Sequence, residues 1–365
     1  MASGCMLRRI ATGALSLAAF GQSAPRTAPV PSDPLEIVTG QIRAVHARES
    51  QAAVLRLLDR ARNSYALRNA GRGYDLKVSF TVDSGGETEY DGAWNMEDVF
   101  DPKQGLRWTA QASDSYSITR ISANGMLYGE DTANYIPLRL QEARAALFDP
   151  LPSAERAARA SIRTSTATFN GAPLTCILLS GSKNSANAPG RRWDETEDCI
   201  DPQSGLLQTH SQVPGRYYAY VYSDTPPLDG HVLPRQVTVT EAGKTVTAIS
   251  VDSLTELPAA DPNLFTPTEE MKARGRAIAM AGAETIWRDF GRGPSASGAT
   301  VHIVCVFGVE TPSGQLVEAH SLQPSDPNSQ AAVEAAKHMS FSRPTHGVQP
   351  QQHFVFVIEK FVSSQ

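Results

Sequence analysis

The chain has 365 residues, of which 41% are hydrophobic and 19% are charged, values that are typical of a globular protein. This length predicts two or three domains. The formal net charge of −5, together with the lack of a basic stripe or an arginine cluster interleaved with aromatic residues, argues against a nucleic-acid partner.

The first residues have the pattern of an export signal. Arg8 and Arg9 precede an apolar run, Ile10–Phe20, and small residues follow from Gly21. A basic start, a short apolar run and a small-residue cleavage site predict a signal peptide over 1–21, and hence a periplasmic or secreted protein. An uncleaved membrane anchor is the alternative, although the run is short for a bilayer. Residues 22–34 are rich in Pro, Ser and Ala and predict a flexible leader.

A helix followed by many strands is expected over 35–267. Apolar residues recur at helical spacing up to Ala66, and Leu76–Val82 then alternates apolar and polar residues. Asn124-Gly125 between two short strand patterns predicts a hairpin. Ile136–Phe148 predicts a helix, and strand patterns resume from Ser165 to Leu254. Sequential hairpins with few helices favour a strongly bent antiparallel sheet that wraps a helix.

The cysteines bear on the compartment. Cys5 would leave with the signal peptide, and three cysteines would remain. In an exported protein two of these should pair, and Cys176 and Cys199 lie on neighbouring segments. Cys305 lies within an apolar strand pattern, so we expect it to be buried as a small hydrophobic residue.

A second, smaller unit is expected at the C-terminal end. Residues 268–298 predict a helical linker that ends in a Gly/Ser/Pro-rich joint. Residues 299–365 then predict a small α+β unit in the order strand, turn, strand, helix, strand. Its elements are Thr300–Val309, Leu316–Leu322, Asn328–Met339 and Phe354–Phe361.

This C-terminal unit, over about 294–362, resembles the TonB C-terminal domain. The resemblance is carried by the strand VHIVCVFGV, by the phrase Gln315–Pro344 and by the last strand, HFVFVIEKF. It implies a small periplasmic module that binds a partner through an exposed edge strand, either His353–Val362 or Thr300–Val309. Phe354, Phe356 and Ile358 are the candidate partner-binding residues. The membrane anchor and long Pro-rich spacer of an energy transducer are not recognisable, so coupling to a proton-motive force is not carried over.

Residues 35–267 resemble the half-barrel group that includes the lipoprotein carrier LolA. The resemblance rests on the helix Val54–Ala66 followed at once by Leu76–Val82, on tryptophans in successive strands, and on the closing segment Leu254–Pro267. It implies a concave apolar face that holds lipid or acyl chains. The candidate lining residues are Trp94, Trp108, Tyr218, Tyr220 and Tyr222. Sheet packing is the alternative role for the tyrosines.

Three other groups of residues have side chains that could form a site. The acidic residues around Cys199 (Asp194, Glu195, Glu197, Asp198 and Asp201) offer oxygens for Ca²⁺, but a solvated hairpin edge explains them as well. Five histidines in the C-terminal unit lack the spacing of a metal motif. His210, Ser211 and Asp224 lack a nucleophile elbow. The sequence therefore predicts no catalytic residue, no metal and no cofactor.

The expected fold class is α+β, with a curved antiparallel half-barrel wrapped on a helix and then a small TonB C-terminal-like domain. The expected function is that of a non-catalytic, exported protein-binding protein in envelope transport, with an envelope protein, such as an outer-membrane protein, as its partner. The alternative is a carrier of lipid or lipoprotein acyl chains in the concave face of the half-barrel.

Overall fold

The computed structural model describes residues 42–85, 90–113, 115–133, 135–169, 171–181, 190–223, 227–277, 286–290, 300–311, 314–339 and 353–363. The predicted signal peptide (1–21) and leader (22–34) lie outside these residues. No helix in the described part of the chain is long and apolar enough to cross a membrane.

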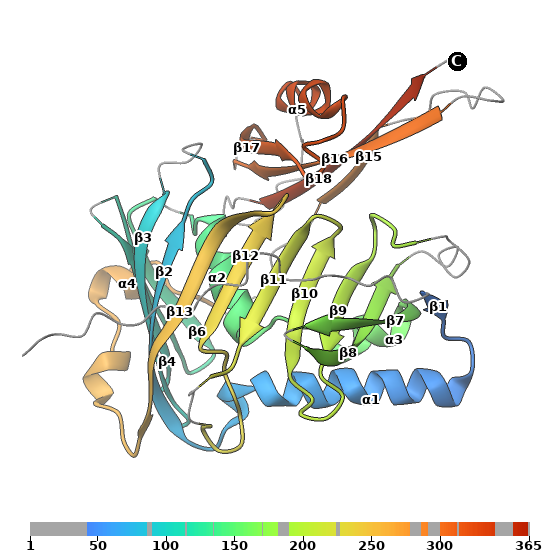
Figure 1. Ribbon diagram of the computed structural model, residues 1–365. Helices are drawn as coiled ribbons and strands as arrows, with labels where there is room; N and C mark the ends of the chain where they lie inside the picture. Colours follow the sequence, from blue (N-terminus) through green and yellow to red (C-terminus); the bar gives the residue numbers. More distant parts are fainter. Residues whose placement is uncertain are drawn as a thin grey trace, which may run out of the picture. The chain divides into compact units, whose positions relative to one another are not determined.

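A large antiparallel sheet forms most of the described chain (Figure 1). Its strands are β1 (Arg43–Ala44), β2 (Gly73–Val82), β3 (Gly92–Asp101), β4 (Gly105–Ala112), β5 (Tyr116–Ala123), β6 (Met126–Asp131), β7 (Ser161–Phe169), β8 (Ala172–Ser180), β9 (Thr196–Ile200), β10 (Leu207–Val213), β11 (Arg216–Val221), β12 (Gln236–Glu241), β13 (Lys244–Leu257) and β14 (Arg276–Ala277). Their spatial order is β1-β7-β8-β9-β10-β11-β12-β13-β2-β3-β4-β5-β6-β14. The predicted bent antiparallel sheet is therefore present.

Most neighbouring strands follow one another in the chain, and the turns between them explain why. At the β5–β6 turn, Asn124 and Gly125 have φ of 52° and 75°. Two successive positive φ angles form the two-residue turn that matches the twist of a hairpin, as the Asn-Gly pair predicted. The exceptions are the pairs β1–β7, β6–β14 and β2–β13, and in the last of these Val82 lies opposite Thr247. This pairing joins the two halves of the sheet.

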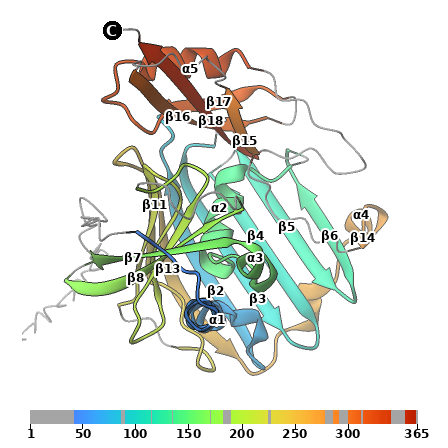
Figure 2. The same cartoon turned by 90° about the vertical axis from the view of Figure 1, so that its right-hand side faces the viewer.

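Three helices lie on the inner side of the curved sheet (Figure 2): α1 (Arg48–Tyr65), α2 (Leu138–Phe148) and α3 (Ala154–Arg159). Leu58, Ala61 and Tyr65 of α1 recur at helical spacing and are buried, as an amphipathic helix requires. The inner side chains of the sheet and these helices form one large apolar cluster. The sheet therefore wraps helices, as predicted, and its inner face is the main core.

The segment predicted as a helical linker differs from the prediction. Within residues 268–298, helix α4 covers only Glu269–Ala273. Two short 3₁₀ turns, Leu67–Asn69 and Pro262–Phe265, lie earlier in the chain. Strand β14 follows α4, and β15 (Ile286–Phe290) pairs in parallel with the last strand of the chain. Gly275 follows α4 closely, and Ile286, Trp287 and Phe290 belong to residue types that favour strands. Pairing with a distant strand thus replaces the expected helix.

The C-terminal unit has the predicted order of strand, strand, helix and strand. After β15 come β16 (Thr300–Glu310), β17 (Leu316–Ser321), α5 (Ser329–Lys337) and β18 (His353–Ser363). The sheet order is β15-β18-β16-β17. The prediction that β16 or β18 is an exposed edge is wrong, because each has a strand on both sides. Sequence alternation places a strand's faces, but it does not say which strand lies at an edge.

The two faces of this small sheet are buried differently. Val304, Val306, Val355 and Val357 pack against Ala332, Val333 and Ala336 of α5. The alternate residues of β16, Cys305 and Phe307, point to the other face, as the two-residue period of a strand demands. There they form a cluster with Phe356 of β18, Leu138 of α2 and Val213 of β10.

Candidate functional site

The inner face of the large sheet has an aromatic half and a polar half. The name "aromatic arm" is used for β2–β5, whose inner side chains include Phe80, Trp94, Trp108 and Tyr116. Phe80 and Trp94 stack with ring centres 5.4 Å apart, and the Trp94 ring lies 5.6 Å from that of Tyr116. The alternation of apolar and polar residues over Leu76–Val82 explains why this face is apolar, because every second residue of β2 is buried.

The name "polar arm" is used for β9–β12. Its inner side chains include Asp198, His210, Tyr218 and Tyr220, and the Arg216 and Glu241 side chains lie at its end. His210 Nδ1 lies 2.8 Å from Asp198 Oδ1, and Asp198 is fully buried. Burial raises the pKa of Tyr220 well above its ordinary value, with the charge of Asp198 among the causes that act in the same direction. This half of the inner face therefore contains charges as well as apolar surface.

Helix α2 covers both arms. Eight of its eleven residues are buried: Leu138, Arg139, Leu140, Glu142, Ala143, Ala146, Leu147 and Phe148. On the aromatic arm, the Arg144 guanidinium lies 3.9 Å from the centre of the Trp108 ring, and its Nη2 donates to Asp98 Oδ2 over 2.8 Å. On the polar arm, the Tyr218 hydroxyl donates to Glu142 Oε1 over 2.5 Å. Charged and polar groups thus add to the apolar contacts through which Leu140, Leu147 and Phe148 hold α2 on the sheet.

A buried cluster of charges surrounds the start of α2. Arg139 Nη1 donates to Glu142 Oε2 (3.1 Å) and Glu241 Oε1 (2.9 Å), and Arg139 Nη2 donates to Glu318 Oε2 of β17 over 2.6 Å. Arg216 donates to Glu142 and, through Nε, to Glu241 Oε1 at 2.8 Å. The side chains of these five residues are at most 3% exposed. In the described residues, three carboxylates here meet two guanidinium groups.

The electrostatics of this cluster follow from burial and charge together. Burial alone would raise the pKa of Glu241, but Arg139 and Arg216 hold it well below its usual range. The pKa of Glu318 is raised, because burial outweighs the effect of Arg139. Burial raises the pKa of the Tyr218 hydroxyl well above its ordinary value. Tyr218 therefore acts as a neutral hydrogen-bond donor and Glu241 as a fixed anion at neutral pH.

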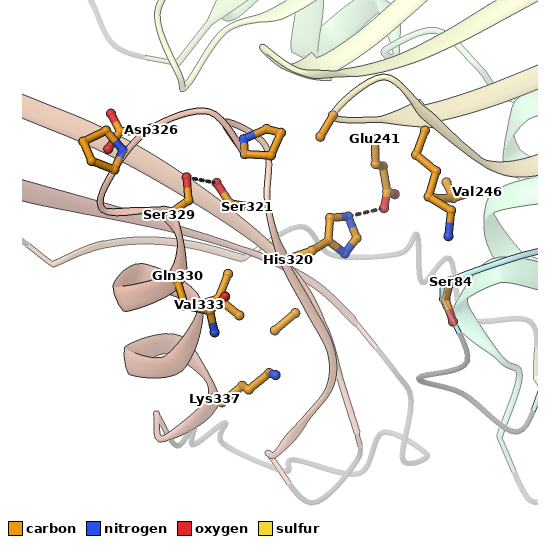
Figure 3. Close-up of a pocket in the computed structure, with 15 residues that line it drawn as sticks. Ser84, Glu241, Val246, His320, Ser321, Asp326, Ser329, Gln330, Val333 and Lys337 are labelled. Carbon is orange, nitrogen blue, oxygen red and sulfur yellow. Dashed lines mark hydrogen bonds and ion pairs between the residues drawn. The ribbon is translucent and has the colours of Figure 1, made fainter.

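A pocket of about 650 Å³ opens beside the cluster (Figure 3). His320 projects from β17 toward Glu241, and its Nε2 lies 2.6 Å from Glu241 Oε2. The lining includes Lys244 from the start of β13 and Ser329 and Lys337 from α5. This volume is in the range of small-molecule sites, but its lining mixes charges, hydroxyl groups and short apolar side chains without a convergent catalytic group.

The sequence-predicted lining residues lie together on the inner face. Trp94, Trp108, Tyr218 and Tyr220 are buried, and Tyr222 is half-buried beside them. The Tyr65 ring of α1 contacts both Tyr220 and Tyr222, with ring centres 6.3 Å apart in each case. The tyrosines therefore pack against other side chains, as the sheet-packing alternative predicted. They lie on the same inner face that the lipid-carrier alternative assigned to a ligand.

The predicted partner-binding residues are not placed as expected. Phe356 is fully buried, with its ring centre 5.6 Å from that of Phe307, because β18 lies inside its sheet. The prediction that Phe356 meets a partner is therefore wrong. The side chains of Phe354 and Ile358 lie outside the described structure.

The cysteines are arranged as predicted. Cys176 and Cys199 form a disulfide between directly opposite positions of β8 and β9, and Cys305 is buried. Burial raises the pKa of the Cys305 thiol, so this group stays protonated. Glu197 lies close to the disulfide. Its carboxylate accepts from Arg191 over 2.9 Å, and the two sulfurs are bonded to each other rather than free to bind a metal.

Of the five acidic residues near Cys199, Glu195, Glu197 and Asp198 are buried, whereas Asp194 and Asp201 are partly exposed. Glu195 pairs with Arg163 at 2.5 Å, and both side chains are 1% exposed. Asp194 pairs with Arg192, and Asp201 closes a turn through Ser204. Each carboxylate thus has its own partner, and they do not converge on one cation. Of His210, Ser211 and Asp224, the last lies outside the described residues, and the Ser211 hydroxyl oxygen lies 2.7 Å from the carbonyl oxygens of both Val213 and Arg216.

Sequence reasoning missed Arg139, Glu142, Arg144, Arg216, Glu241 and Glu318. One signal was present: Ile136–Phe148 contains three charged residues within an otherwise apolar helix pattern. Such charges are usually assigned to the solvent face of a helix. Their partners lie as far as 179 residues away, so nothing local identified them as buried.

Comparisons with known proteins are limited to structure. No family model and no curated protein matches the chain. Similar solved structures include a LolA superfamily protein from Nitrosomonas europaea (10% identity, 58% of this chain and 96% of that chain, TM-score 0.36). A DUF1329 family protein from Desulfovibrio piger has 11% identity, covers 58% of this chain and 96% of that chain, and has a TM-score of 0.36. The MucA/MucB complex of Pseudomonas aeruginosa has 11% identity, covers 72% and 81%, and has a TM-score of 0.26. Similarities at these TM-scores carry no functional argument.

Proposed function

We propose that this protein is an exported, non-catalytic binding protein that carries an apolar chain, such as the acyl chain of a lipid, on the inner face of its curved sheet. The observation that carries the proposal is the contrast between that face and the helix on it. The aromatic arm presents large apolar rings, whereas α2 adds three charged side chains, Arg139, Glu142 and Arg144, to apolar ones such as Leu140, Leu147 and Phe148.

This contrast favours a helix that can be displaced. Burying large aromatic and aliphatic side chains stabilises a core by about 1.5–3 kcal/mol each. A buried ion pair adds little net stability, because the loss of hydration offsets the attraction between the charges. An apolar ligand that takes the place of α2 would replace the apolar contacts that Leu140, Leu147 and Phe148 make in this cluster, and the charged side chains of α2 would return to water. The inner face is therefore suited to exchange between helix and ligand.

Binding of a fluorescent fatty acid to the purified protein tests the proposal. We expect saturable binding of a dansyl-labelled undecanoic acid, with energy transfer from Trp94 and Trp108 to the dansyl group. Replacing Trp94 by Leu removes part of the aromatic contact and should weaken binding about tenfold, which corresponds to about 1.4 kcal/mol. Since Leu does not donate energy, affinity is read from dansyl polarisation.

Asn95→Ala is the matched control, because Asn95 is the next residue of β3 and is exposed on the opposite face. We expect its affinity to equal that of the unaltered protein. Absence of saturable binding, or equal losses in the two variants, would contradict a carrier role for the inner face.

A docking role for the C-terminal unit stays a prediction from its resemblance to the TonB C-terminal domain. The burial of Phe356 removes one of its three candidate contacts. The unit's described contacts instead join it to α2, β10, β11 and β12 of the same chain.

A further inference from the structure

The C-terminal unit contacts α2 at its first turn. Leu138 and Arg139 are the first two residues of the helix. Leu138 lies in the apolar cluster with Cys305, Phe307 and Phe356. Arg139 donates to Glu318 over 2.6 Å, and its guanidinium carbon lies 5.2 Å from the centre of the Phe307 ring. Apolar, ionic and cation–π contacts therefore all converge on one turn of one helix.

This turn has little support from α2 itself. The N-cap residue is Pro137, which makes no side-chain capping bond, and the first turn has no acidic residue. Arg139 is instead a cation at the helix end where the backbone dipole favours anions. An isolated helix of 11 residues is marginal in water. The start of α2 is therefore stabilised from outside, by Glu241 of the large sheet and by Glu318 of the C-terminal unit.

The Phe307 ring also contacts the guanidinium group of Arg216. The guanidinium carbon of Arg216 lies 4.7 Å from the centre of the Phe307 ring, and Arg216 donates to Glu142 of α2. Phe307 of β16 therefore contacts both Arg139 and Arg216, the two cations of the buried cluster at the start of α2. Removal of the C-terminal contact changes the surroundings of Arg139 and Arg216 together.

We propose that the C-terminal unit is an internal lock, which holds α2 on the inner face of the sheet through the contact of Glu318 and Phe307 with Arg139. Loss of this contact releases the start of α2 while α1 stays in place. The consequence for ligand access rests on the proposed function, whereas the lock itself is a property of the fold. A partner that binds the C-terminal unit and disturbs this contact would open the inner face from a distance.

Hydrogen–deuterium exchange of the full chain tests the lock without a ligand. In Glu318→Ala we expect peptides from Leu138–Phe148 to exchange about tenfold faster, and peptides from Arg48–Tyr65 to be unchanged. Glu334→Ala is the matched control, because Glu334 also belongs to the C-terminal unit but pairs at the surface with Lys337. It should leave the exchange of both helices unchanged.

A conservative variant distinguishes loss of the Glu318 contact from general destabilisation of the fold. Glu318→Gln keeps the length of the side chain and an oxygen acceptor for Arg139, so its α2 peptides should exchange at a rate between those of the unaltered protein and Glu318→Ala. Equal acceleration of α1 and α2 in Glu318→Ala would overturn the lock, since it would show general destabilisation. Unchanged exchange of α2 would overturn it as well.

The fatty-acid assay separates the two proposals. If both stand, Glu318→Ala binds the dansyl-labelled fatty acid more tightly than the unaltered protein and Glu334→Ala does not. If α2 exchanges faster in Glu318→Ala but neither protein binds the fatty acid, the lock stands and the carrier function fails. If the fatty acid binds equally to all three proteins and α2 exchange does not change, the carrier function stands and the lock fails.

Discussion

The aromatic arm and the polar arm hold the same helix by different means. On the aromatic arm, shape dominates: Phe80, Trp94 and Tyr116 pack ring against ring, and α2 adds the ion pair of Arg144 with Asp98. On the polar arm, Arg216 and Glu241 meet Arg139 and Glu142 with almost no exposed surface. Packing of the first kind is insensitive to pH and cannot be undone by a partner's charge. The second kind can be changed by the gain or loss of a single charge.

The largest expected effect comes from breaking the polar arm. Replacing Arg216 by Met leaves Glu142 and Glu241 as buried carboxylates that share Arg139. We expect a loss of about 3–5 kcal/mol in the free energy of unfolding, because removal of one member of a buried ion pair leaves charge uncompensated. Urea unfolding measures it. Arg72→Ala, at an exposed ion pair with Glu256, serves as the control and should leave the transition unchanged.

A comparable test breaks the aromatic arm. Phe80→Ala removes a buried ring that stacks on Trp94, and we expect a loss of about 3 kcal/mol through lost contact and the resulting cavity. The loss should be the same at pH 5 and pH 8, since no titratable group is altered. A loss that varies strongly with pH would contradict the distinction between the two arms.

A smaller effect is expected where α2 meets the aromatic arm. Arg144→Ala removes the charge that faces Trp108 and pairs with buried Asp98. We expect a loss of about 2 kcal/mol, in the range for a hydrogen bond to a charged group, with faster exchange at the C-terminal end of α2. Arg156→Ala, on the exposed side of α3, is the control. Exchange that changes only at the N-terminal end of α2 would refute this assignment.

The smallest effect is a pH dependence that only the polar arm should show. The pKa of Glu241 is lower in the folded protein than its ordinary value of 4.5. A depressed pKa contributes stability that is fully present above the ordinary value and is lost as pH falls through the folded-state pKa. Glu241→Gln should therefore show a shallower loss of stability below pH 4.5 than the unaltered protein. Parallel curves for the two proteins would remove Glu241 as the cause.

Local signals in the sequence were enough for much of the fold. Alternation at Leu76–Val82 places β2 and its buried face, and Asn124-Gly125 places a hairpin, because both depend on residues that are close in the chain. The same alternation places Cys305 and Phe307 together on one face of β16. These features follow from period and turn chemistry alone.

Partners that are distant in the chain were not predictable in this way. Arg139 reads as a surface charge until β12 and β17 bring Glu241 and Glu318 to it. Residues 286–290 read as part of a helical linker until β18 offers a strand to pair with. The inner positions of β16 and β18 likewise depend on neighbours elsewhere in the chain. In each case a contact across many residues overrode a local preference.

The pairing of β2 with β13 joins strands that lie far apart in the chain. The aromatic arm can form from consecutive hairpins, but its β2 edge stays unpaired until β13 reaches it from the far end of the polar arm. Pairing across a long stretch of chain carries a large loop-closure entropy and is slow. We therefore expect the joining of the two arms to limit the rate of folding. Until then, the open edge of β2 is where an incomplete chain is most exposed to aggregation.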